Sequence, residues 1–140
     1  MKAAIIYHSK RGTTQKYAAE IAFYLKKKGI ESKVTSIQKF NNNDIVDVDY
    51  IFFGCWTSGL FVILQHPEKE WKEFAKSLQQ NKTAKTALFT TYKLRTGSMF
   101  GNMKKVLRDK TNEASMLLQS RDGELTENNR NLIDKFLEIK

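Results

Sequence analysis

The stretch "AAIIYHSKRGTT", residues 3–14, joins a short apolar run to a loop with one glycine among hydroxyl-bearing and basic side chains. The apolar part predicts a buried strand over residues 3–8. Over residues 13–28, apolar side chains recur at helical spacing, and Gly29 is a stop signal. The loop therefore lies where a strand ends and a helix begins. At such a place, unpaired backbone N–H groups and the helix dipole favour an anion.

Three hydroxyl groups, those of Ser9, Thr13 and Thr14, can add donors to the backbone N–H groups of this loop. The loop is not a P-loop, because the pattern GxxxxGK[ST] is absent. It is not a dinucleotide fingerprint either, because GxGxxG is absent. We infer that the anion is the phosphate of a monoester.

The rest of the chain repeats the order of strand and helix. Trp71, Phe74 and Leu78 recur at helical spacing after Pro67, which suits a first helical position. Further strands are predicted over residues 32–37, 50–54, 86–91 and 114–120, and further helices over about 100–107 and 125–137. Five strands that are separated by helices imply a doubly wound α/β fold, with one parallel sheet and helices on both faces.

The composition limits the classes of protein to which the chain can belong. The chain has 140 residues, of which 41% are hydrophobic and 11% aromatic, so we expect a single domain over residues 1–140. No apolar run has the length of a signal-peptide core or a membrane span, which predicts a cytoplasmic protein. One cysteine, Cys55, and two histidines without metal-ligand spacing fit a reducing compartment and predict no metal site.

The charge is unevenly distributed along the chain. The formal net charge is +9 at pH 7, and the basic surplus is confined to residues 1–40 and 81–112. The segments 41–80 and 113–140 are acidic overall. A basic surplus that is confined to two segments needs a structural or functional explanation. Nucleic-acid binding is only a minor alternative, because a basic helix surface is usually a solvated face.

Glycines mark the ends of three predicted strands. Gly12 follows the first strand, Gly54 ends the third with Gly59 after it, and Gly97 follows the fourth. Ligands of doubly wound sheets bind at the carboxyl ends of the strands, so these loops are expected to converge on a ligand. The alternative, that any such turn needs glycine, is weaker for three loops than for one.

The loop over residues 9–14 resembles the phosphate loop of the flavodoxins, which has the form [ST]-x-[ST]-G-x-T. Here it reads Ser9-Lys10-Arg11-Gly12-Thr13-Thr14. Arg11 departs from the pattern, and a charge-assisted contact is expected where the family more often has a hydroxyl. Looser matches are "GCWTSG" (54–59), "FTTYKLRTG" (89–97) and "GELTENN" (123–129). The resemblance implies a flavodoxin-like sheet with strand order 2-1-3-4-5 and FMN as the cofactor.

By this resemblance, the two later loops enclose the isoalloxazine ring of FMN between Trp56 and Tyr92. A flat tricyclic ring gains dispersion and stacking from such side chains. The peptide between Ser58 and Gly59 matches one that turns over in flavodoxins when the flavin is reduced. The residues implied to bind FMN are Ser9, Lys10, Arg11, Gly12, Thr13, Thr14, Trp56, Thr57, Ser58, Gly59, Thr91, Tyr92 and Gly97.

The resemblance also implies an electron carrier that shuttles single electrons between a reductase and an acceptor. An FMN-dependent oxidoreductase acting on a quinone or porphyrinogen, and a binding module without flavin, stay open as alternatives. The short loops favour the carrier, and no residue is assigned a catalytic role. Cys55 is expected to be a bystander thiol, and His8 a packed or loop histidine.

Ordinary flavodoxins are acidic, whereas Lys10, Arg11, Lys93 and Arg95 place positive charge in two of the site loops. Positive charge stabilises an anionic reduced flavin, so we expect a less negative second reduction potential. It also predicts redox partner proteins with an acidic docking face. No membrane partner is expected.

Overall fold

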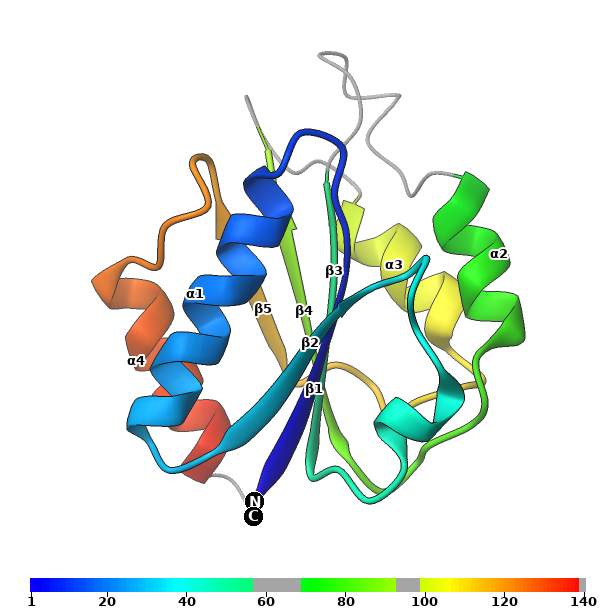
Figure 1. Ribbon diagram of the computed structural model, residues 1–140, viewed down its shortest axis with the longest axis horizontal. Coiled ribbons are helices and arrows are strands. Elements are labelled where there is room, and N and C mark those ends of the chain that lie inside the picture. Colours follow the sequence, from blue (N-terminus) through cyan, green and yellow to red (C-terminus); the bar gives the residue numbers. More distant parts are fainter. Residues whose placement is uncertain (57–68, 93–98, 139–140) are drawn as a thin grey trace.

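The computed structural model describes residues 1–56, 69–92 and 99–138. Five parallel strands form one sheet in the order β2-β1-β3-β4-β5, which confirms the predicted fold and strand order (Figure 1). The strands are β1 (Lys2–His8), β2 (Glu31–Ser36), β3 (Tyr50–Trp56), β4 (Lys85–Thr91) and β5 (Met116–Ser120). The helices are α1 (Thr13–Lys27), the short 3-10 helix η1 (Asn42–Ile45), α2 (Lys69–Ser77), α3 (Met99–Leu107) and α4 (Glu127–Glu138).

Helices cover both faces of the sheet. Figure 1 shows α1 and α4 on one side, and α2 and α3 on the other. Ile21 and Phe136 belong to the hydrophobic cluster on the first side. Trp71 and Met103 belong to the cluster on the second side. Because both faces are covered, the central strand β3 can be apolar along most of its length, as its sequence predicts. None of the described helices is long and apolar enough to cross a membrane.

The turn from α1 into β2 forms at Gly29, where the sequence predicts the end of the helix. Gly29 has a left-handed φ of 81° just after the helix. Its N–H donates to the carbonyl of Lys26 at 3.0 Å, and the N–H of Ile30 donates to the carbonyl of Leu25 at 2.9 Å. These two bonds form a Schellman motif, which ends the helix and directs the chain back to the sheet.

One glycine has a different role from the predicted one. The strand β3 extends to Trp56, so Gly54 lies inside the strand instead of after it. Gly54 pairs with Phe89 of β4, and a Cβ at Gly54 would overlap the Phe89 ring. The glycine is therefore needed for packing between two strands. The predicted start of α2 at Pro67 lies outside the described residues, and β5 and α4 begin a few residues later than the sequence pattern predicts.

Candidate functional site

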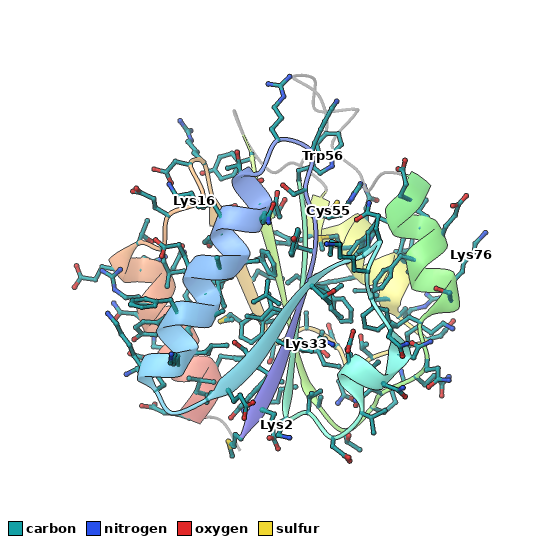
Figure 2. All side chains as sticks on the ribbon, in the orientation of Figure 1. Lys2, Lys16, Lys33, Cys55, Trp56 and Lys76 are labelled. Carbon is teal, nitrogen blue, oxygen red and sulfur yellow. The ribbon has the colours of Figure 1, made fainter. Side chains whose placement is uncertain are left out.

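The carboxyl ends of four strands meet at one edge of the sheet. The register pairs His8 with Cys55, Trp56 with Thr91, and Thr91 with Ser120. Figure 2 shows Trp56 at this edge and Lys2 at the opposite end of the molecule. The strand ends from which the three glycine-containing loops depart therefore lie side by side.

The loop after β1 leads into a helix start without a protein cap. Gly12 is the N-cap residue, with a left-handed φ of 90°, and no side chain caps the helix. The first turn of α1 contains no acidic residue. The N–H of Gly12 donates to Ser9 Oγ at 3.0 Å, which leaves the hydroxyl proton of Ser9 for another acceptor. This set of donors, at the positive end of a helix dipole, fits a phosphate group.

Thr14 is the one residue of the predicted loop that is buried. Its hydroxyl oxygen lies 2.7 Å from that of Thr91, at the end of β4. One of the two hydroxyl protons is used in this bond, so the pair keeps one proton for a further acceptor. Thr14 thus joins α1 to β4, in addition to the phosphate contact that the sequence predicts for it. Lys10 and Arg11 are exposed, and Ser9 and Thr13 are half-buried.

Trp56 lies at the end of β3, half-buried against the α2–α3 side of the core. Its ring centroid is 6.3 Å from that of His8, and Lys10 Nζ is 4.9 Å from the ring centroid. The indole Nε1 is buried and has no hydrogen-bond partner among the described residues. A buried N–H without an acceptor is costly, so this atom fits a ligand with an acceptor at its edge.

Tyr92 follows the end of β4 and is half-buried. Its N–H donates to the carbonyl of Ser120 at 3.1 Å, which holds the start of this loop against β5. The guanidinium carbon of Arg121 lies 5.4 Å from the centroid of the Tyr92 ring. An aromatic ring and a cation therefore stand together at the edge of the sheet, on the far side of β4 from Trp56.

The loop after β5 also reaches this edge, and the sequence did not assign its residues to the site. Ser120 Oγ accepts the N–H of Gly123 at 3.0 Å. Gly123 has a φ of 82°, and a Cβ there would lie 2.7 Å from the carbonyl oxygen of Thr13. Glycine thus allows this loop to pack on the start of α1. The place of the loop after the fifth strand is the signal that could have identified it.

One carboxylate in this loop is held by hydrogen bonds from neighbouring residues. Asp122 accepts the N–H of Glu124 at 2.9 Å and the hydroxyl of Ser120 at 3.1 Å. The backbone hydrogen bond from Glu124, followed by the bond from Ser120, holds the pKa of the Asp122 carboxyl below its usual value. Asp122 is therefore ionised at neutral pH.

The family model for the flavodoxin domain matches residues 4–137 of the chain. The chain belongs to the flavodoxin family. Flavodoxins bind FMN and use it to transfer electrons, so this chain is an FMN-binding electron-transfer protein. The described residues fit that cofactor, with an uncapped helix start for its phosphate and an unpartnered indole N–H beside the position expected for its ring.

Solved flavodoxin structures have the same fold. Oxidised flavodoxin 1 from Bacillus cereus is 16% identical with a TM-score of 0.74, and the match covers 100% of this chain and 99% of that one. Two-electron reduced Megasphaera elsdenii flavodoxin is 20% identical with a TM-score of 0.73, covering 96% and 97%. A short-chain flavodoxin associated with a non-canonical PDU bacterial microcompartment is 14% identical with a TM-score of 0.75, and the match covers 99% of this chain and 95% of that one. No curated protein sequence matches the chain.

Several predicted site residues of this flavodoxin lie outside the described residues. They are Thr57, Ser58, Gly59 and Gly97, together with the cations Lys93 and Arg95. Cys55 is fully buried in the core beneath the site. His8 is also buried, and its ring lies beside that of Trp56. The described residues contain no cluster of His, Cys, Asp and Glu that could hold a metal ion.

Proposed function

We propose that this flavodoxin shuttles single electrons between a reductase and an acceptor protein. The observation that carries the proposal is the meeting of an uncapped α1 start, the half-buried Trp56 and the half-buried Tyr92 at one edge of the sheet. FMN, when bound, supplies a ring that takes up and releases electrons one at a time. The chain itself binds and orients the cofactor and keeps water from one part of it.

Each predicted residue has a role in this proposal. Residues 9–14 hold the phosphate through their N–H and hydroxyl donors, with Arg11 adding a charged contact. Trp56 and Tyr92 flank the ring, and the indole N–H of Trp56 donates to its edge. Thr57, Ser58, Gly59, Thr91 and Gly97 complete the cofactor contacts. The half-buried position of Trp56 leaves part of the edge accessible, as direct electron transfer to a partner requires.

The charge of the edge determines the kind of partner. Lys10, Arg11 and Arg121 are exposed there. A partner with an acidic docking face would therefore associate faster, and the rate would fall as salt rises. We also place the protein in the cytoplasm, where a single buried thiol stays reduced.

Anaerobic reduction followed by absorbance tests the proposal. The purified holoprotein should hold one FMN per chain and accept electrons in two separate steps. Stopped-flow mixing with a flavodoxin reductase should then show rapid electron transfer that slows as salt rises. Steady turnover of a quinone or porphyrinogen at a comparable rate would overturn the carrier role in favour of an oxidoreductase.

A further inference from the structure

A cavity of about 540 Å³ lies far from the FMN edge, between α3, β4 and the segment that joins α3 to β5. Thr86 and Leu88 of β4 form its floor, and Leu107 and Ala114 add apolar surface. Thr86 is the second residue of β4, so the floor lies towards the amino end of this strand. A cavity of this size can hold a small organic molecule. The contacts assigned to FMN do not include any of these residues.

Among the described helices, α4 packs on β5, and it does so on the other face of the sheet. Met116 and Leu118 point into the cluster under α1 and α4. Their neighbour Leu117 points the other way and is 38% exposed. Leu117 pairs with Leu88, which lines the cavity. Leu117 is therefore one exposed apolar side chain beside the buried Leu88.

Cations line the cavity on the side of α3. Gly101, Lys104, Lys105 and Arg108 all line it, and their spacing places them on one face of the helix and its end. No ion pair among the described residues involves these three cations. Lys82 adds a fourth cation, whose Nζ donates to the carbonyls of Arg108 at 3.2 Å and Thr111 at 3.1 Å.

Glu113 is the acidic residue among the residues that line the cavity. The excess of cations accounts for part of the basic surplus that the sequence shows over residues 81–112, and electron transfer at the opposite edge does not require it. The floor also holds an unsatisfied polar group, because the hydroxyl of Thr86 is buried without a hydrogen-bond partner among the described residues. A bound molecule with an acceptor atom would satisfy this donor.

We propose that this cavity binds an amphipathic organic anion, with one carboxylate, sulfonate or phosphate group on an apolar body. The cations Lys104, Lys105 and Arg108 bind the acidic group, and the apolar lining of Leu88, Leu107 and Ala114 contacts the body. Neutralising cations that form no ion pair among the described residues favours binding, and contact with the apolar lining adds to it. The site is independent of the proposed electron transfer.

Fluorescence titration with anilinonaphthalene sulfonate, an apolar ring system with one sulfonate, tests this site. The FMN-loaded protein should be used, so that the flavin site is filled. We expect saturable binding of one probe per chain. Lys104→Glu combined with Arg108→Glu should weaken it by about tenfold or more, the equivalent of one strong charged contact. Lys26→Glu combined with Lys72→Glu changes the net charge equally on exposed residues outside the lining and should leave binding unchanged.

A second variant tests the cavity without changing charge. A Cβ at Gly101 would meet nothing within 4 Å, so a Leu side chain can begin there without a clash, and Gly101→Leu should reduce the space for the probe and weaken its binding. An octanoate or octyl phosphate competitor should displace the probe, and inorganic phosphate should not. The absence of saturable binding, an equal loss in the control variant, or full binding to Gly101→Leu would each overturn the proposal.

Discussion

The hydroxyl oxygens of Thr14 and Thr91 lie 2.7 Å apart, and this hydrogen bond ties the start of α1 to the end of β4. Both residues are buried, with exposed fractions of 1% and 5%. Among the described residues, this buried polar contact joins the end of the phosphate loop to the strand residue just before Tyr92. Because each loop supplies part of the proposed FMN site, the stability of the fold and the affinity for FMN depend on the same bond.

A double-mutant cycle tests this relationship. Thr14→Val and Thr91→Val should each destabilise the apoprotein by about 1–3 kcal/mol, because each leaves a buried hydroxyl without its partner. The double variant should cost less than the sum of the two, since no polar group is then left unpaired. Urea unfolding measures the free energies. Additive effects would show that the two hydroxyls are not coupled.

The left-handed conformation of Gly12 predicts a specific cost of substitution. Gly12→Ala should lower the free energy of unfolding by roughly 1–2 kcal/mol, because the φ of 90° is strained for a residue with a Cβ. It should also weaken FMN more than riboflavin, since only FMN uses the phosphate loop. Titration of both flavins measures the difference.

Gly101→Ala is the matched control for this loop variant. Gly101 is helical and its Cβ would have open space, so the change should stabilise the protein by roughly 0.5–1 kcal/mol. Its effect on FMN binding should be absent. An equal loss of affinity for FMN and riboflavin in Gly12→Ala would contradict the phosphate assignment of residues 9–14.

The fold could be predicted from the sequence because alternating apolar runs and helical patterns are strong local signals. The end of β3 could not be predicted in this way. Gly54 is a turn signal by itself, and its packing against Phe89 depends on the neighbouring strand. The place of Gly12 before α1 was predictable from the loop pattern. The hydrogen bond between Thr14 and Thr91 was not, because it joins residues that are distant in sequence. The role of Gly123 was missed for the same reason, since its close neighbour Thr13 belongs to another loop.

Trp56 and Trp71 are the two tryptophans of the chain, and only the first lies at the site edge. In a Trp71→Phe background, Trp56 is a single fluorescent reporter, and FMN should quench it strongly. Trp56→Phe should weaken FMN modestly, because the ring stays and the N–H donor is lost. Trp56→Ala should weaken it more, by about 0.5–1.5 kcal/mol from stacking alone. Unchanged affinity in both variants would remove Trp56 from the site.

The loop after β5 predicts a dependence of stability on pH. The folded-state pKa of Asp122 lies below its usual value of 3.8, so its hydrogen bonds stabilise the fold above that pH and are lost as the pH falls through the lowered pKa. The wild type should therefore be more stable than Asp122→Asn at pH ~6, and the difference should shrink on acidification towards pH ~2. Urea unfolding across this range measures it. If the free energies of unfolding of the wild type and of Asp122→Asn differ by the same amount at every pH, the carboxylate charge does not contribute to stability.

The last prediction concerns the exposed cations at the site edge. One charge about 8 Å from the ring contributes roughly 2 kcal/mol at an effective dielectric constant of about 20. Salt screening of exposed side chains reduces this to a few tenths of a kcal/mol each. At about 59 mV per 1.4 kcal/mol for one electron, Lys10→Glu combined with Arg121→Glu should make the second reduction potential more negative by some tens of millivolts. Lys93 and Arg95 were predicted to act in the same way and lie outside the described residues.

Lys26→Glu combined with Lys72→Glu changes the net charge equally on α1 and α2, and should leave the potential nearly unchanged. Anaerobic titration gives the potentials, and stopped-flow mixing gives the salt dependence of electron transfer. If the edge variant changes the second reduction potential and the salt dependence of electron transfer no more than the control variant does, the basic edge serves solubility and does not tune the flavin.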